Sequence, residues 1–205
     1  MEIKTQIERS ALLVIDAQDS FKVGPRWLRR NNFDFEKNVA ALVEGFRAKK
    51  LPIYFFLDWD DTEHFEPRSP HFKLMDFLQP ANNEPVLIKT SRNCFTTTNL
   101  DYLLRRSDVK RIVVAGIKTE QCCETTTRVA SDLGYEVDFV TEATLTFPIP
   151  HRELQEELAV EEVVKRTEYA LHNRFARINT VAGLLAELGG DNSRATPRVR
   201  PAAAG

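Results

Sequence analysis

Cysteine is scarce in this chain, and no long apolar run interrupts it. The 205 residues include three cysteines, Cys94, Cys122 and Cys123, an odd number of which two are adjacent. This pattern excludes the evenly paired disulfide framework of small secreted proteins and favours a reducing compartment. No stretch approaches the roughly 18 consecutive apolar residues that a membrane-spanning helix needs.

An excess of one charge is also missing. Lysine and arginine number 28 and aspartate and glutamate 30, for a formal net charge of -2. Nothing in this balance attracts nucleic acid or an anionic membrane. The first ten residues, MEIKTQIERS, lack the apolar segment of a secretory signal. We therefore expect a cytoplasmic protein whose partner is a small molecule, with no nucleic-acid or membrane partner.

The composition and length are those of one soluble domain with a substantial core. Apolar residues make up 42% of the chain and charged residues 28%. The last residues read DNSRATPRVRPAAAG, without any periodic apolar pattern. We expect a domain over residues 1–190 and a flexible tail over residues 191–205.

Short β-rich runs alternate with segments of helical period. The expected strands are Ala11–Asp16, Pro52–Asp58, Val86–Lys89, Arg111–Ile117, Glu136–Thr141 and Ala176–Thr180. Most are nearly continuous apolar runs, which is typical of parallel strands covered on both faces. Apolar residues at i, i+3, i+4 and i+7 mark helices between them, such as Val39, Leu42, Val43 and Phe46; Thr126, Val129, Ala130 and Leu133; and Val164, Thr167, Leu171 and Phe175. The alternation predicts an α/β fold, a Rossmann-like three-layer α/β/α sandwich on a six-stranded, mainly parallel sheet.

The segment 60–84 interrupts this alternation. It is long, polar and rich in proline and aromatic residues, and loops of this length are usually functional. Its phenylalanines Phe65, Phe72 and Phe77 either line a pocket or form a satellite core.

Ligands of open α/β sheets bind beyond the carboxyl ends of the strands. Asp16 ends the first expected strand, Asp58 the second and Lys89 the third, and the fourth leads into Cys122 near the start of a helix. A cysteine in the first helical turn gains thiolate character from the helix dipole, and a neighbouring lysine adds to it. Free N–H groups of that turn can bind an oxyanion, while a carboxylate moves the proton. Taken alone, Cys122 can equally be a buried hydrophobe, and Asp16 with Lys89 a structural ion pair.

Three segments together resemble the isochorismatase-like cysteine hydrolases, in the branch that contains nicotinamidases and N-carbamoylsarcosine amidases. They are DAQDSF from Asp16, IKTSRNCFTTTNLDYLL from Ile88 and AGIKTEQCCETTTRVASDLGYEVDFVTEAT from Ala115. The resemblance spans residues 9–188 and implies a catalytic triad of Asp16, Lys89 and Cys122. It also implies a non-proline cis peptide at Ile117–Lys118, which with Cys122 forms the oxyanion region, and a homo-oligomer. The substrate-binding residues implied are Gln18, Phe21, Trp59, Phe95 and Thr119.

The presence of Cys122 narrows the expected reaction. The founding isochorismatases cleave an enol ether and lack this cysteine, so the chain is more similar to the amidohydrolase branches. We expect Cys122 to attack an amide or ureido carbonyl and to form an acyl-enzyme that water hydrolyses. A non-catalytic or redox-responsive protein that kept the fold is the alternative.

Metal binding distinguishes nicotinamidases, which carry an Asp-x-His pair and a later histidine. Here the first histidine is replaced, giving Asp58-Trp59-Asp60 with His64 and His71 beyond. We therefore expect no metal and no cofactor. A metal-dependent, nicotinamidase-like enzyme that uses Asp58, Asp60 and His71 is the alternative.

Loop residues near these segments could hold the substrate. Arg26, Arg29, Arg30 and Arg92 are candidates for bidentate contacts with a carboxylate, although loop arginines are more often solvated. Trp27, Trp59 and Phe95 could stack on a planar group. At about 100° per residue, Cys122 and Cys123 cannot point the same way. The helical stripe from Thr126 to Leu133 directs Cys122 towards the strand ends and Cys123 into packing.

Overall fold

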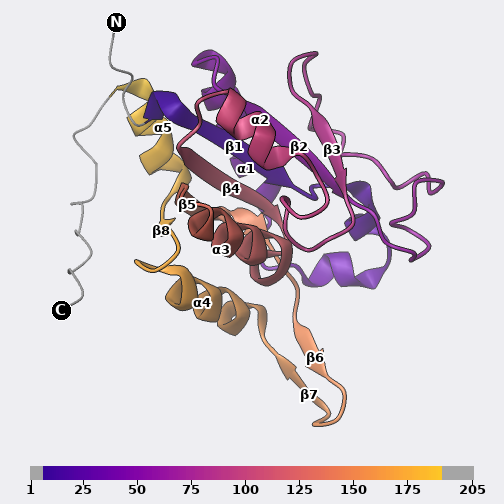
Figure 1. The fold of residues 1–205 in the computed structure, drawn as a ribbon. Helices are drawn as coiled ribbons and strands as arrows, with labels where there is room; N and C mark the ends of the chain where they lie inside the picture. Colours follow the sequence, from indigo (N-terminus) through magenta and orange to yellow (C-terminus); the bar gives the residue numbers. More distant parts are fainter. Residues whose placement is uncertain (1–6, 191–205) are drawn as a thin grey trace, which may run out of the picture.

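Six parallel strands form the central sheet of the computed structural model, which describes residues 7–190 (Figure 1). In spatial order they are β3 (Val86–Lys89), β2 (Ile53–Asp58), β1 (Ser10–Ile15), β4 (Arg111–Ile117), β5 (Glu136–Leu145) and β8 (Arg177–Ile178). Every neighbouring pair is parallel. The order reverses direction between β1 and β4, and this is where ligands bind in such sheets.

The three central strands are buried at every residue because helices cover both sheet faces. Along β1, Leu12 and Val14 enter the core on one face, while Leu13 and Ile15 enter the core on the other. A strand with two buried faces has no polar side to alternate with, which explains the continuous apolar runs in the sequence.

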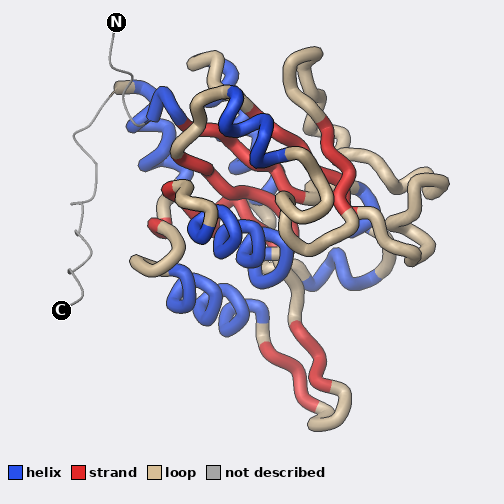
Figure 2. Tube along the Cα trace, viewed as in Figure 1, coloured by secondary structure: helices blue, strands red, loops and turns tan. Residues whose placement is uncertain are grey.

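Five helices complete the sandwich within the described part of the chain. α1 (Phe35–Ala48) and α5 (Val181–Gly189) pack on one face of the sheet. α2 (Leu100–Arg106), α3 (Glu124–Asp132) and α4 (Val160–Leu171) lie on the other (Figures 1 and 2). The predicted three-layer α/β/α architecture is therefore confirmed.

The predicted elements differ from the structure mainly at the sheet edge. The last expected strand shortens to Arg177–Ile178, and β5 extends beyond its expected end to Leu145. α5 was not predicted, nor was an antiparallel hairpin of β6 (Ile149–His151) and β7 (Glu156–Leu158). This hairpin projects from the sandwich (Figure 1). Its strands are exposed or half-buried, so they carry no apolar run that could be recognised.

Two helical stripes are out of phase with the prediction. In α4 the buried residues include Val163 rather than Val164, and the helix ends before Phe175. In α3 Thr127 is buried, whereas Leu133 lies past the helix end and is 40% exposed. A π-helical turn precedes α3, and its i→i+5 bonding shifts the angular phase that an ideal α-helix would give.

The long segment between β2 and β3 crosses the carboxyl edge of the sheet. It is fastened by a bridge between Gln18 and Leu74 and by a 2.9 Å hydrogen bond from the Met75 N–H to the Ala17 carbonyl. Phe77 packs edge-on against Phe35 in the core. Phe65, in contrast, packs edge-on against Phe21 near the strand ends. The segment thus provides both core packing and a wall beside the sheet edge.

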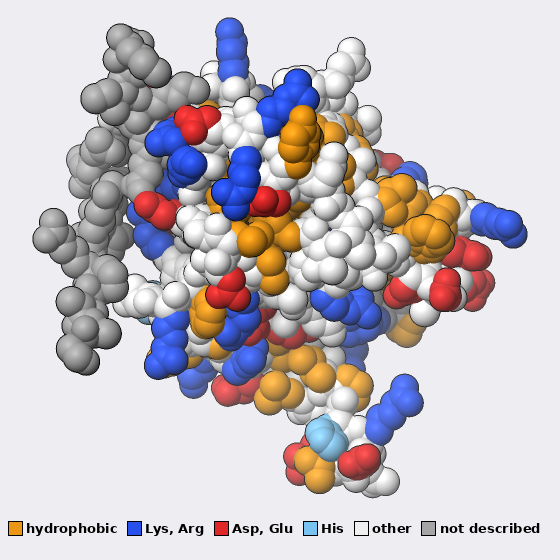
Figure 3. Space-filling model, in the orientation of Figure 1, with side chains coloured by type: hydrophobic (Ala, Val, Ile, Leu, Met, Phe, Trp, Pro, Cys, Tyr) orange, Lys and Arg blue, Asp and Glu red, His pale blue; other side chains and the backbone are white. Residues whose placement is uncertain are grey.

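The surface is of mixed charge. Figure 3 shows lysine and arginine interspersed with aspartate and glutamate on the visible face. Among residues 7–190, no helix combines the length and the apolar character that crossing a bilayer requires. The predicted C-terminal tail, 191–205, lies outside the described residues.

Gly116 allows β1 and β4 to approach at the end that carries the chemistry. Its φ is 135°, and a Cβ at this position would lie 2.0 Å from the Ile15 carbonyl oxygen. Ile15 and Gly116 are paired in register, so the two backbones cannot separate without breaking the ladder.

Gly116→Ala should therefore lower the free energy of unfolding by about 3 kcal/mol or more, measured by chemical denaturation. Gly189→Ala is the matched control, because a Cβ there meets open space at a helix end. It should change stability by at most about 1 kcal/mol. Equal effects of the two substitutions would contradict the close approach.

Candidate active site

Four side chains converge at the carboxyl edge of the sheet. Asp16 follows β1 with a φ of 51°, while Asp58 and Lys89 are the paired last residues of β2 and β3. Cys122 lies in the π-helical turn Thr119–Cys123 after β4. The Lys89 Nζ is 2.9 Å from Asp16 Oδ2, 2.7 Å from Asp58 Oδ1 and 3.5 Å from Cys122 Sγ. Parallel strands thus bring together residues that are far apart in the sequence.

Burial makes the charges of this group strongly interdependent. Asp16 and Lys89 are fully buried, and Cys122 is 3% exposed. Burial alone would lower the pKa of Lys89, but the negative charges of Asp16 and Asp58 outweigh it and raise the pKa. Lys89 is therefore a permanent ammonium group that holds two carboxylates together.

Asp16 is a carboxylate with spare capacity to accept a proton. Burial raises its pKa to about 6, although the positive charge of Lys89 opposes the rise. Neither of its oxygens accepts a well-directed hydrogen bond from the described residues. By contrast, Asp138, a buried aspartate in a separate ion-pair network, accepts hydrogen bonds from Arg111, Arg177 and Asn179. A buried carboxylate left this open is characteristic of functional rather than purely structural sites.

The thiol of Cys122 differs from the prediction. Burial raises its pKa, the charge of Asp16 raises it further, and Lys89 only partly opposes them. The prediction that a helix N-terminus favours the Cys122 thiolate is wrong for two reasons. Cys122 lies in a π turn rather than an α-helical first turn, and the nearby carboxylates disfavour a second negative charge. The resting group is a neutral thiol beside an ionised Asp16.

The turn around the thiol is built on the Lys118 carbonyl. This carbonyl accepts hydrogen bonds from the N–H groups of Gln121 and Cys123, both at 3.2 Å, and the second is the i→i+5 bond of the π turn. The peptide bond between Ile117 and Lys118 is cis, as the family resemblance implies. A role of Ile117, Lys118 and Cys122 in binding an oxyanion remains a prediction.

The two adjacent cysteines have different surroundings. Cys122 Sγ faces Lys89, whereas Cys123 is completely buried in the core beneath α3. The predicted separation of their directions therefore holds, although the α-helical phase used to derive it does not apply to a π turn.

Two of the predicted substrate-binding residues are engaged in the scaffold. The Gln18 side chain accepts a 2.7 Å hydrogen bond from the Asp58 N–H and donates to the Asp58 carbonyl at 3.2 Å. The Thr119 hydroxyl donates to Thr144 at 2.8 Å. Gln18 therefore positions Asp58, and Thr119 anchors the turn to β5.

The predicted aromatic contacts separate into two groups. Phe21 lies beside the site, with the Lys118 Nζ 6.0 Å from its ring centre. Trp59 follows β2 and is 42% exposed. Phe95 stacks instead on Tyr135, which precedes β5 at the opposite end of the sheet. Its assignment to substrate binding is a misreading of a packing residue.

The four candidate arginines also separate. Arg29 pairs with Glu157 on the projecting hairpin, and Arg30 stacks on Trp27. Neither contacts the site, which corrects their candidacy. Arg92 lies 3.3 Å from Asp58 Oδ2, and Arg26 lies over the ring of Phe147. These last two flank the site.

The alternative metal site has a different composition from the one predicted. Among the described residues, the ligand atoms that cluster within 4.8 Å belong to Asp16, Asp58 and Cys122. Asp60 bonds its neighbour Thr62, and His71 packs against His64. The Lys89 ammonium contacts all three clustered atoms and so supplies the positive charge that a metal ion would bring. The predicted set of Asp58, Asp60 and His71 is therefore not assembled.

Asp58 has a contact that the sequence did not predict. It was expected at the end of the second strand and as an alternative metal ligand, and in the structure it is also the second counter-ion of Lys89. The available signal was its position at the end of β2, directly beside the end of β3.

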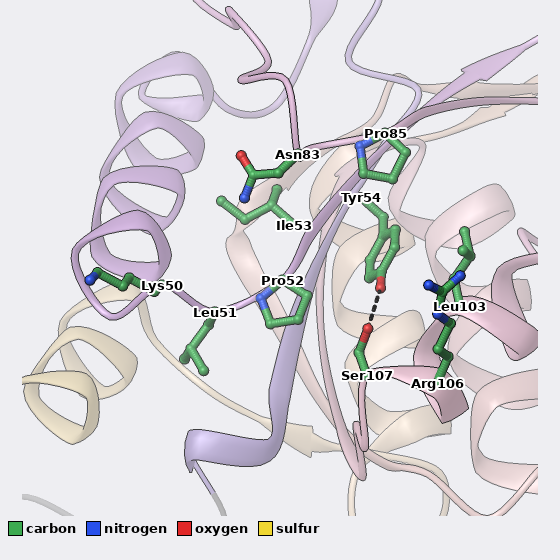
Figure 4. Close-up of a pocket in the computed structure, with 10 residues that line it drawn as sticks. All are labelled: Lys50, Leu51, Pro52, Ile53, Tyr54, Asn83, Pro85, Leu103, Arg106 and Ser107. Carbon is green, nitrogen blue, oxygen red and sulfur yellow. Dashed lines mark hydrogen bonds between the residues drawn. The ribbon is translucent and has the colours of Figure 1, made fainter.

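Two surface hollows lie away from the thiol. One, of about 380 Å³, is lined by Pro52, Tyr54, Leu103 and Ser107 at the amino ends of β2 and β3 (Figure 4). Inside it, the Tyr54 and Ser107 hydroxyl oxygens are 3.4 Å apart. The other is lined by Asn31, Glu142 and their neighbours. Neither hollow is lined by Asp16, Asp58, Lys89 or Cys122, so both are separate from the buried cluster.

Solved structures of isochorismatase-family proteins share this architecture. An isochorismatase-family protein from Chromobacterium violaceum has the same fold, with a TM-score of 0.84 and 26% identity over 93% of this chain and 97% of that one. The sequence model of the family described as the isochorismatase domain matches residues 10–172. The chain therefore belongs to the isochorismatase family of hydrolases.

Curated relatives are consistent with this assignment. YrdC, an isochorismatase family protein of Bacillus subtilis, is 28% identical over 181 residues, 87% of this chain and 95% of YrdC. The ureidoacrylate amidohydrolase RutB of Cronobacter sakazakii is 27% identical over 157 residues, 59% of this chain and 68% of RutB.

Lys89→Met should leave two carboxylates buried without their cation. We expect the free energy of unfolding to fall by about 3–5 kcal/mol at pH 8. The loss should be smaller at pH 5, because burial raises the pKa of Asp16 to about 6 and protonation then neutralises this carboxylate. The exposed residue Lys49 gives the control Lys49→Met, with an expected change below about 0.5 kcal/mol. Denaturation at both pH values is the measurement, and a pH-independent loss would argue against the charge cluster.

Proposed function

We propose that this protein is a cysteine amidohydrolase that cleaves the C–N bond of a small amide or ureido compound. The observation that carries the proposal is the buried contact of Lys89 with both Asp16 and Cys122, which places a proton acceptor beside a thiol. The similarity to a ureidoacrylate amidohydrolase supports the same reaction class. Hydrolysis of an enol ether, the reaction of family members that lack this cysteine, would leave Cys122 without a role.

Acylation begins with the neutral thiol. As Cys122 Sγ attacks the carbonyl carbon, its proton passes to the Asp16 carboxylate and the carbonyl oxygen becomes an oxyanion. Backbone N–H groups of the turn after β4 are the donors that this oxyanion would use. The C–N bond then breaks, and Asp16 returns the proton to the leaving nitrogen, which departs as ammonia or an amine.

Deacylation repeats the proton transfer with water. Asp16 takes a proton from the attacking water while the water oxygen bonds to the thioester carbon. The C–S bond then breaks, the proton returns to Cys122 and the acid product leaves. Lys89 remains charged throughout and stabilises the ionised form of Asp16. Asp58 is the second counter-ion that holds Lys89 in place.

An ammonia-release screen over small primary amides and ureido acids tests the reaction class directly. Turnover of at least one compound by the wild-type protein, and none by Cys122→Ala, is the expected result. Release that persists in Cys122→Ala would refute a cysteine mechanism.

The two cysteines should respond differently to substitution. Cys122→Ala should lower kcat by about three orders of magnitude or more, since no other thiol faces Asp16 and Lys89. Cys123→Ala removes a buried sulfur from the core and should cost about 1 kcal/mol of stability while the chemistry is retained. Mass spectrometry of the trapped acyl-enzyme should locate the adduct. An adduct on Cys123 would overturn the assignment.

The pH profile of kcat/KM should follow Asp16. The general base must be ionised, so activity should rise with pH through about 6 and then reach a plateau. The raised pKa of Cys122 predicts no second rise from thiolate formation near neutral pH. Asp16→Asn should abolish turnover with the fold intact, as circular dichroism would check. A profile that rises only above pH 8 would instead indicate a thiolate nucleophile.

A further inference from the structure

Three cationic side chains near the proposed site, Arg26, Arg92 and Lys118, have Asp58 as their one ion-pairing carboxylate among the described residues. The Lys118 ammonium is half-buried, and its closest polar contact is the Gln121 side-chain oxygen at 3.5 Å. Within residues 7–190 no carboxylate forms an ion pair with Lys118 or with Arg26. A half-buried ammonium without a counter-ion is costly, so its environment points to an anion that arrives from outside.

Arg26 and Lys118 lie over adjoining aromatic rings. The Arg26 guanidinium is 4.7 Å from the centre of Phe147, and the Lys118 Nζ is 6.0 Å from the centre of Phe21. The two rings stack with their centres 6.4 Å apart. Arg26 itself is exposed and so remains available to a ligand.

Arg92 approaches the site from the other side. Its guanidinium contacts Asp58 Oδ2 at 3.3 Å, while the other oxygen of Asp58 is held by Lys89. Arg92 is 59% exposed, and its single contact leaves the rest of its donors free. Lys89 contacts Cys122 in turn, so Asp58 and Lys89 connect Arg92 to the nucleophile.

The three cations act on one another. The pKa of Lys118 is lowered first by burial and then by the positive charges of Arg26 and Arg92, with Glu120 and Cys122 opposing. Both guanidinium groups are therefore within electrostatic range of the same ammonium. Mutual repulsion of this kind is relieved when an anion binds among them.

We propose that Arg26, Arg92 and Lys118 bind a carboxylate of the substrate, so that the enzyme acts on amide or ureido acids rather than on neutral amides. The inference rests on the proposed function, because the bound anion is part of the compound that Cys122 attacks. Arginine recognises a planar carboxylate by bidentate hydrogen bonds. Since Asp58 already engages Arg92, the group suits a monoanion better than a dianion such as phosphate.

Turnover of matched compounds tests the preference. Succinamate and N-carbamoylglycine are compared with their methyl esters, which lack the negative charge. The acids should have kcat/KM values about tenfold or more above those of the esters, the size of one charge-assisted hydrogen bond. Arg26→Gln and Arg92→Gln should each reduce this preference about fivefold or more through a higher KM for the acid. Arg29→Gln is the matched control, because Arg29 pairs with Glu157 on the hairpin.

Alkylation of Cys122 gives a readout that does not depend on turnover. The sulfur displaces iodide from iodoacetate or from neutral iodoacetamide, and mass spectrometry restricts the measurement to Cys122. The rate with iodoacetate divided by the rate with iodoacetamide should be about fivefold higher for Cys122 than for glutathione in the same buffer. Added salt should lower this ratio for Cys122. Arg26→Gln and Arg92→Gln should move the ratio towards that of glutathione, and Arg29→Gln should leave it unchanged.

The two measurements separate the inference from the proposed function. Hydrolysis of acids and esters at equal kcat/KM, or a ratio no higher than that of glutathione, would overturn the carboxylate site and leave the cysteine hydrolase in place. A high, arginine-dependent ratio without hydrolysis of any compound would support the anion site and overturn the amidohydrolase.

Discussion

The structure of the site depends on the Lys89 ammonium, which is buried between two carboxylates. Placing three charges in the interior costs more than a simple apolar core would, and only close pairing makes it tolerable. Attraction between close opposite charges offsets this cost, since Lys89 lies within 3 Å of both Asp16 and Asp58. A purely structural pair would be more fully hydrogen-bonded, as Asp138 is at the other end of the sheet. The open oxygens of Asp16 therefore mark a group kept ready to take up a proton.

Several weaker features keep this cluster in place. The register of β2 and β3 sets Asp58 beside Lys89, and the Gln18 amide fixes the end of β2 from the neighbouring loop. Gly116 lets β4 approach β1 closely enough for the turn carrying Cys122 to reach Lys89. Each contact is ordinary, but together they hold the acid, the ammonium and the thiol at distances suited to proton transfer.

The charge around the thiol is arranged in two layers with opposite balance. The inner layer contains two carboxylates for one ammonium, and burial together with the charge of Asp16 raises the pKa of the Cys122 thiol. The outer layer contains Arg26, Arg92 and Lys118, for which Asp58 is the one ion-pairing carboxylate within the described residues. In the mechanism we propose, the outer layer would attract and orient an anionic substrate, while the inner layer would carry out the acid–base chemistry.

The sequence by itself determined the layered fold, because continuous apolar strands are a local pattern. It made Asp16, Lys89 and Cys122 candidates through their strand-end positions, and the family resemblance joined them into one group. The sequence could not determine which loop side chains share that edge. Phe95 and Arg29 looked equivalent to Phe21 and Arg26, yet their partners, Tyr135 and Glu157, are distant in the chain. The π turn likewise altered both the helical phase and the environment of the thiol. Charge state and side-chain direction depend on neighbours brought together by folding, and so only the tertiary structure decided them.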